Sequence, residues 1–216
     1  MLKADLHVHT EYSMDCGTPL HTIIERCQER GINCLAIADH GTVEGALELQ
    51  SIAPFKVIVA EEILTPYGEI MGMFLKESVP NGLSVEETIA CIRAQDGIVC
   101  IPHAFDVLRP SALDPKVMEE IAQEIEVIEV FNARSLLHHS SEKVLAFARK
   151  YDIAQSAGSD AHVPSAIGNA YVEMPAFEGR GDFIQALREG RITGRRTNPL
   201  THFASAWNKL KNRAWR

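Results

Sequence analysis

Short apolar runs and longer amphipathic segments alternate along most of the chain. The apolar runs are rich in β-branched residues, which is typical of buried strands, whereas the amphipathic segments repeat apolar residues at helical spacing. A further run at 70–75 follows a turn sequence and is expected to form a hairpin with the run before it. The strands predicted by this pattern span residues 2–6, 33–38, 56–60, 98–101, 125–130 and 153–157.

Local capping signals mark the helices between these strands. Thr18-Pro19 is typical of an N-cap followed by proline in the first helical position, and Gly31 is a stop signal. Ser84 and Glu87 have the spacing of a capping box, and Asp114-Pro115 opens another helix. The predicted helices therefore cover about residues 19–30, 43–52, 85–92, 115–122, 141–150 and 182–188.

The alternation of strands and helices predicts an α/β fold. Parallel pairing with right-handed crossovers places the C-terminal ends of the strands on one side. Six or seven such units favour a closed or nearly closed α/β barrel, in which the residues after the strands share one rim. An open doubly wound sheet is the main alternative, but the first strand is not followed by a glycine-rich phosphate loop.

Histidine and carboxylate residues end nearly every predicted strand. His7 and His9 follow the first strand two positions apart. In an extended backbone their rings point the same way and can chelate one ion, with Asp5 and Thr10 placed to orient them. Histidine with carboxylate suits zinc, manganese or iron, and more than four such ligands imply a cluster of ions. The strand ends supply His7, His9, Asp39, His40, Glu61, Glu62, His103, Asn132, Asp160 and His162.

Each of these residues also has an ordinary structural explanation. His40 can neighbour a helix cap, His103 can occupy a turn, and Asp160 can cap the segment after it. For these explanations to hold together, unrelated structural roles would have to fall by coincidence at equivalent positions of successive strands. A shared metal cluster explains all of these positions at once and is therefore favoured. A surface or packing role is the default for the histidines in helical or loop contexts, His21, His138, His139 and His202.

Composition excludes several classes of protein. The chain of 216 residues is long enough for one sizeable domain, and its 46% hydrophobic and 23% charged residues are ordinary for a globular protein. We see neither a signal-peptide pattern nor an apolar run of the roughly 20 residues that a spanning helix needs, so we expect a cytoplasmic protein that does not enter a membrane. The five cysteines lack C-x-x-C spacing and are expected to be reduced thiols.

Charge separates the C-terminal segment from the rest of the chain. The net charge of -8 argues against a general nucleic-acid binder, yet seven Lys or Arg and no Asp or Glu follow Glu189. Phe203, Trp207 and Leu210 share one face of a possible helix over 201–216. We therefore expect a barrel domain over 1–195 and a basic helical tail over 196–216 that docks on it, with a nucleic-acid arm as the alternative.

Five motifs together resemble the PHP (polymerase and histidinol phosphatase) family. The resemblance runs from residue 1 to about residue 195 and is greatest for the small stand-alone members. It implies a distorted (β/α)7 barrel of the TIM-like type that binds two or three divalent ions, manganese, zinc or iron. The motifs are Asp5-Leu6-His7-Val8-His9-Thr10, Ala38-Asp39-His40-Gly41, Ala60-Glu61-Glu62-Ile63, Ile101-Pro102-His103 and Gly158-Ser159-Asp160-Ala161-His162.

The resemblance also implies a set of ligands. One ion would be held by His7, His9, Glu62 and Asp160; a second would share Glu62 and take His103; a third would use Asp15, His40 and His162. We assign Glu62 rather than Glu61 because it is the residue before the isoleucine of the motif. The last ligand of the second ion is left open between Asn132 and the histidines His138 and His139.

The family chemistry is hydrolysis of a phosphate ester. We expect a metal-activated hydroxide to attack phosphorus without a covalent intermediate, because no nucleophilic Ser or Cys has a supporting triad. The residues expected to act in this step are His40 as proton donor, His162 near the phosphoryl oxygens and Asp160 as ligand. Arg134 and Arg109 are candidates for gripping the substrate phosphate, although both could equally form surface salt bridges.

Three functions are compatible with these residues. The first is a phosphoesterase acting on a phosphate monoester of a small metabolite, such as a nucleotide or a compound like histidinol phosphate. The second is a nuclease that trims 3' ends, with Arg195, Arg196 and the basic tail contacting the nucleic-acid backbone. The third is a metal-binding module with little catalysis.

Overall fold

The computed structural model describes residues 1–135 and 139–198, with the backbone alone for 139–141. The predicted tail helix over 201–216, with His202, and the possible ligand His138 lie outside the described residues, as does the side chain of His139.

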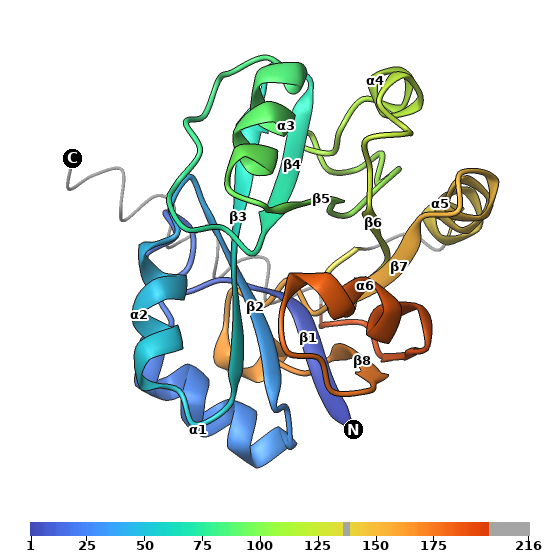
Figure 1. The fold of residues 1–216 in the computed structure, drawn as a ribbon. Coiled ribbons are helices and arrows are strands. Elements are labelled where there is room, and N and C mark those ends of the chain that lie inside the picture. The colour runs from blue at the N-terminus through green and yellow to red at the C-terminus, as the bar shows by residue number, and fades with distance from the viewer. Residues whose placement is uncertain (136–138, 199–216) are drawn as a thin grey trace.

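One mixed sheet forms the centre of the molecule, with helices around its outside (Figure 1). Its strand order is β7-β6-β5-β4-β3-β2-β1-β8-β9. The strands are β1 (Leu2–Val8), β2 (Cys34–His40), β3 (Lys56–Thr65), β4 (Gly68–Met73), β5 (Ile98–Ile101), β6 (Val127–Asn132), β7 (Ala154–Gly158), β8 (Ala170–Met174) and β9 (Arg191–Gly194). The α-helices are α1 (Leu20–Arg30), α2 (Glu44–Ile52), α3 (Val85–Ala94), α4 (Pro115–Glu120), α5 (His139–Lys150) and α6 (Arg180–Arg188).

Hydrogen bonds after β7 nearly close the sheet into a barrel. The backbone N–H of Asp160 donates to the carbonyl oxygen of His7 at 2.8 Å, and that of His9 donates to Ala161 at 3.1 Å. Val8 and Ala161 form an isolated parallel bridge. The predicted α/β barrel is therefore confirmed, and its closure brings the first and last motifs of the chain together.

The sheet also contains antiparallel strands. The predicted hairpin is present as β3–β4, and β4 also pairs antiparallel with β5. We predicted no strands where β8 and β9 lie, which pair antiparallel with β1 and with each other. In β8 buried residues alternate with half-buried ones, and β9 is half-buried or exposed, so neither shows the apolar run that marks the interior strands.

The helix signals are mostly confirmed. Ser84 and Glu87 form a reciprocal capping box, with distances of 3.2 and 2.9 Å, and Gly31 ends α1 with a φ of 66°. The prediction for the start of α1 was wrong by one residue: the helix begins at Leu20, and Pro19 occupies the cap position without a side-chain hydrogen bond. Proline lacks a backbone N–H and its φ suits either position, so the motif did not decide between them.

Two of the strands contain irregularities close to the barrel mouth. The register between β1 and β2 shifts between Asp5 and Val8, and that between β6 and β7 shifts between Glu129 and Phe131. Such bulges change which side chains face the interior. Below them the barrel is filled mainly by small and medium apolar side chains, including Ala4, Leu6, Ala36, Ala38, Ala60 and Ala157.

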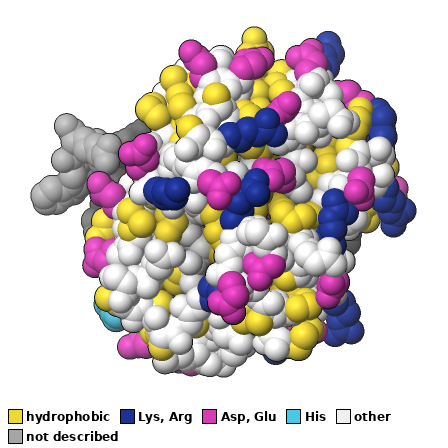
Figure 2. Space-filling view, viewed as in Figure 1, with side chains coloured by type: hydrophobic (Ala, Val, Ile, Leu, Met, Phe, Trp, Pro, Cys, Tyr) yellow, Lys and Arg dark blue, Asp and Glu magenta, His cyan; other side chains and the backbone are white. Residues whose placement is uncertain are grey.

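The surface drawn in Figure 2 mixes charges of both signs. Lys and Arg side chains alternate there with Asp and Glu side chains and form no extended basic patch. Among the helices in residues 1–135 and 139–198, none combines the length and the apolar character needed to cross a bilayer.

Candidate metal centre

The predicted ligands converge at the mouth of the barrel. β1 carries His7 and is followed directly by His9, and β2 ends in His40. β3 carries Glu62, whereas Asp15 comes from the loop before α1. His103 follows β5, and the segment after β7 supplies the remaining two. All eight are joined by close contacts between ring nitrogens and carboxylate oxygens: His7, His9, Asp15, His40, Glu62, His103, Asp160 and His162.

The first group consists of the histidine pair with two acids. The Nε2 atoms of His7 and His9 lie 3.2 Å apart. Oε1 of Glu62 is 3.3 Å from Nε2 of His7, and Oε2 is 3.4 Å from Nε2 of His9. Oδ1 of Asp160 is 3.4 Å from Nε2 of His9 and 3.9 Å from that of His7. These four residues are the ones expected to share the first ion.

The second group contains a residue that we did not predict. Nε2 of His103 lies 2.9 Å from Oε1 of Glu62 and 3.3 Å from Oε2 of Glu69. The other oxygen of Glu69 is 3.4 Å from Nδ1 of His40. Glu69 is the second residue of the antiparallel strand β4, two positions from Met71, which pairs with Glu62 in the hairpin and so shares its face. An acid beside an apolar strand is the signal that could have identified it.

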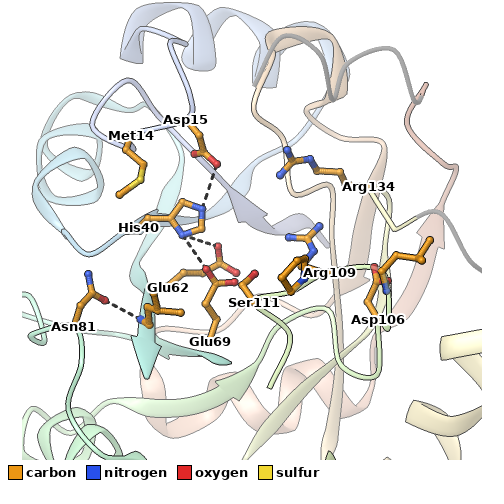
Figure 3. Close-up of a pocket in the computed structure, with 13 residues that line it drawn as sticks. Met14, Asp15, His40, Glu62, Glu69, Asn81, Asp106, Arg109, Ser111 and Arg134 are labelled. Atoms are coloured by element: carbon orange, nitrogen blue, oxygen red, sulfur yellow. Dashed lines mark hydrogen bonds and ion pairs between the residues drawn. The ribbon is translucent and has the colours of Figure 1, made fainter. Parts of the chain in front are cut away.

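The third group surrounds Asp15. Its two oxygens lie 3.2 Å from Nε2 of His162 and 3.6 Å from Nε2 of His40. His9 also belongs to this set, with ligand atoms within 4.8 Å of the others, and therefore lies between the first and third groups. His40 has a similar place between the third group and the second (Figure 3).

Several neighbouring residues have roles other than those expected. Asp5 accepts from the backbone N–H groups of Ser159 and Gly168, and Thr10 donates to Asp39, so neither orients a histidine ring. Glu61 faces away from the cluster and accepts from the N–H of Val79.

Asn132, the uncertain ligand, uses its side-chain oxygen to accept from the backbone N–H groups of Arg134 and Ser135. Its amide group donates to Glu129 at 2.8 Å and to Asp160 at 3.2 Å. In this arrangement Asn132 holds two acids in place, and no oxygen of its side chain faces the ring nitrogens.

The surroundings shift the pKa values of His7 and His9 in opposite directions. Burial, reinforced by His162, lowers the pKa of His9 to about 3, so its ring is neutral. Burial acts on His7 in the same direction, but Glu62, Glu129 and Asp160 outweigh it and raise the pKa of His7 well above the usual value. Burial alone would raise the pKa of Glu62, yet the histidines around it hold that pKa well below the usual value.

These residues fit divalent ions. Oε2 of Glu62 and Oε2 of Glu69 are buried and accept no hydrogen bond within the described part of the chain. A buried carboxylate oxygen without a partner is costly, and a cation removes that cost. Among the described residues, three groups have ligand atoms close enough to hold an ion: His7, His9 and Glu62; His9, Asp15, His40 and His162; and His40, Glu62 and Glu69.

A cavity of about 460 Å³ opens onto the cluster. Asp15, His40, Glu62 and Glu69 lie at its centre, and two arginines lie together on one side of them (Figure 3). Nη2 of Arg109 is 2.5 Å from Oδ2 of Asp160, and Nη1 of Arg134 is 3.2 Å from the ring nitrogens of His162. Both arginines predicted from the sequence therefore line the cavity, and each also contacts a proposed ligand.

Comparison with known proteins identifies the family. A family model described as PHP domain matches residues 5–76, and one described as PHP-associated matches residues 138–192. The chain is also 35% identical over 176 residues to an uncharacterized protein of Methanocaldococcus jannaschii, covering 80% of this chain and 70% of that protein. The chain belongs to the PHP family. The first family model spans the first three motifs, from Asp5 through Ile63, which include four of the proposed ligands.

Solved structures share the PHP fold at low sequence identity. A two-domain protein from Bacteroides vulgatus, described as containing a predicted PHP-like metal-dependent phosphoesterase, aligns with a TM-score of 0.72 and 16% identity. The alignment covers 90% of this chain and 65% of that one. A structure from Chromobacterium violaceum, described as an amidohydrolase with bound sulfate and no metal, has a TM-score of 0.66 and 16% identity over 88% of this chain and 97% of that one. The fold is thus shared by proteins described with different chemistry.

Proposed function

We propose that this PHP protein is a metal-dependent phosphoesterase that hydrolyses a phosphate monoester of a small metabolite. The observation that carries the proposal is the cluster of histidines and carboxylates at the floor of a cavity flanked by two arginines. Carboxylates and imidazoles together bind the ions that suit phosphate chemistry, and guanidinium groups match the geometry of phosphate oxygens.

The residues that would hold the ions are the eight predicted from the sequence together with Glu69. Glu69 takes the place that was left open for the second ion, beside His103 and Glu62. Bound divalent ions supply such a site with an activated water molecule and neutralise charge on the phosphate.

The side chains of the cavity wall would orient the substrate. Arg109 and Arg134 lie on the same side of the cavity and can grip phosphate oxygens opposite the carboxylates (Figure 3). His40 faces the cavity with 20% of its side chain exposed, so a ring nitrogen not used as a ligand is placed to protonate the leaving oxygen. His162 and Asp160, which contact Arg134, would hold ions that neutralise the phosphoryl oxygens of the ester.

The rim of the cavity favours an ester with an apolar organic part. Met14, Leu64 and Leu108 line the cavity, and their exposed fractions are 46%, 49% and 57%. Exposed large apolar side chains that gather around one opening indicate a contact surface for a ligand. A small substrate with a phosphate at one end and an apolar or ring-bearing group at the other fits this division. A nucleic-acid strand would instead require an extended basic surface.

The decisive experiment is a hydrolysis assay. Protein loaded with manganese, zinc or iron should hydrolyse p-nitrophenyl phosphate, and His9→Ala should lose at least about 100-fold in kcat/KM because it removes a residue shared by two ligand groups. The matched control is His21→Ala, an exposed histidine on α1 that should retain full activity.

The dependence on salt concentration distinguishes a small-molecule phosphoesterase from a nuclease. Activity on a small monoester should change little between 50 and 200 mM salt, whereas affinity for an oligonucleotide bound through several phosphates would fall by orders of magnitude. Absence of hydrolysis with every metal would contradict the phosphoesterase and favour a metal-binding module.

A further inference from the structure

Glu129 on β6 contacts the proposed metal centre at three places. Its Oε1 lies 3.1 Å from Nδ1 of His7. Its Oε2 accepts from the backbone N–H of His103 at 2.6 Å and from the amide of Asn132 at 2.8 Å. The same amide is 3.2 Å from Oδ2 of Asp160. One buried carboxylate thus connects residues that belong to three motifs of the family.

The contact with His7 decides which nitrogen of that ring faces the cluster. A carboxylate only accepts hydrogen bonds, so Nδ1 of His7 carries a proton and donates to Glu129. Nε2 is then the nitrogen available to a cation, and it is the atom that lies 3.3 Å from Glu62. Ligand histidines are commonly held in this way by an acceptor on the other ring nitrogen.

The contact with His103 acts on the backbone. His103 has a φ of 33°, a conformation that residues with a side chain rarely adopt. Its N–H is held by Glu129, and its ring reaches Glu62 at 2.9 Å. The hydrogen bond therefore supports the unusual backbone that directs this ring into the cluster.

The fold makes specific room for this acid. The register shift after Glu129 lets both Glu129 and Asn132, three residues apart, face the same side of β6. Gly158, at the end of β7, lies against His7 of β1. A Cβ atom at Gly158 would lie 2.2 Å from Cβ of His7 and 2.9 Å from Oε1 of Glu129. The glycine is thus required for the close approach of the acid to the histidine.

We propose that Glu129 is a positioning residue of the metal centre: one oxygen sets the His7 ring with Nε2 toward the ions, and the other holds His103 and, through Asn132, Asp160. The inference rests on the proposed metal site. It predicts that Glu129 affects metal affinity even though it does not touch the ions, because the ligands it holds would lose their orientation without it.

Glu129→Gln tests this role with almost no change in shape. An amide offers one acceptor and one donor, so either Nδ1 of His7 or the N–H groups of His103 and Asn132 would face a donor. We expect zinc and manganese to bind 10- to 100-fold more weakly, as measured by equilibrium dialysis. In the ¹⁵N-labelled, zinc-loaded protein, the Nδ1–H signal of His7 should be present in the wild type and lost or displaced in the variant.

The matched control is Glu120→Gln, an exposed acid on α4, which removes the same charge and should leave both readouts unchanged. Equal metal affinity and an unchanged His7 signal in Glu129→Gln would overturn the inference while leaving the proposed function intact. A wild-type protein that binds neither metal would overturn both. If Glu129→Gln does not fold, Glu129→Asp retains the charge but is too short for both contacts; wild-type affinity in that variant would equally overturn the role.

Discussion

The strand pair β2–β3 and the strands β1 and β6 deliver residues to the same site in different ways. β2 and β3 pair in unbroken parallel register from Cys34 and Lys56 to His40 and Glu62. Along them every second residue faces the barrel interior, so small apolar side chains below lead directly to the ligands above. In this pair strict alternation predicts which side chains face the site.

In β1 and β6 the alternation is interrupted. Leu6 packs with the barrel interior, and the next residue, His7, nevertheless contacts Glu62 in the cluster. Glu129 and Asn132 likewise face the same side although three positions separate them. A bulge lets one strand fill the core with one set of alternating residues and supply the site with the other set. The difference teaches that the regular strands place their ligands by alternation alone, whereas in the bulged strands a local shift brings His7 and Asn132 to the site.

The largest effect is expected at Gly158, where the bulged strands approach each other. Gly158→Ala places a Cβ atom 2.2 Å from that of His7, so β1 and β7 must separate. We expect the free energy of unfolding to fall by about 3 kcal/mol or more, measured by urea denaturation. The control is Gly181→Ala on α6, whose Cβ would meet nothing within 4 Å and which should be neutral or stabilising by up to about 1 kcal/mol. Equal stability of the two variants would show that the close approach is not required.

An intermediate effect should distinguish two buried aspartates. Asp5 on bulged β1 accepts from the N–H groups of Ser159 and Gly168 with different oxygens, so Asp5→Asn leaves one N–H facing a donor. Asp39 on β2 accepts from the N–H and the hydroxyl of Thr10, and the hydroxyl can reverse, so Asp39→Asn keeps both hydrogen bonds. The free energy of unfolding should therefore be about 2 kcal/mol lower in Asp5→Asn than in Asp39→Asn.

Burial raises the pKa of both aspartates to about 6. A carboxyl whose folded-state pKa is raised lowers the free energy of unfolding when it is ionised, above that pKa. This destabilisation is relieved as the pH falls below about 6 and the group becomes protonated. This contribution is therefore present in both residues at pH 7 and cancels when the two variants are compared by thermal denaturation. If Asp39→Asn lost more stability than Asp5→Asn, the hydrogen-bonding roles given to the two aspartates would be wrong.

The smallest effect is expected at the end of regular strand β3. Leu64 continues the alternation from Glu62 and reaches the cavity rim half-exposed. Leu64→Ser should leave stability unchanged and raise KM for p-nitrophenyl phosphate about fivefold, or about 1 kcal/mol, by removing an apolar contact. KM for glycerol 2-phosphate should not change. Ile52→Ser, an exposed residue of α2 away from the cavity, is the control. An equal change for both esters would contradict an apolar rim contact.

The amino-acid pattern was sufficient for the order of the helices and the first seven strands, the barrel and seven of the eight residues that converge at its mouth; Asp15 followed only from the family resemblance. Parallel strands place their C-terminal ends together whatever their detailed geometry, so a histidine or acid after each apolar run is enough to indicate a shared site. The choice of Glu62 over Glu61 followed from its place in the family motif, and the structure places Glu62 in the cluster and Glu61 on the opposite face.

Glu69, Glu129 and the strands β8 and β9 were decided only by the tertiary structure. Glu69 reaches the cluster because β4 folds back antiparallel on β3, and Glu129 meets His7 because the barrel closes between β7 and β1. Pairing direction and register depend on contacts between residues far apart in the chain, which local periodicity does not contain. The sequence therefore carried the ligand types, whereas the partners that orient those ligands emerged only when distant strands were brought into contact.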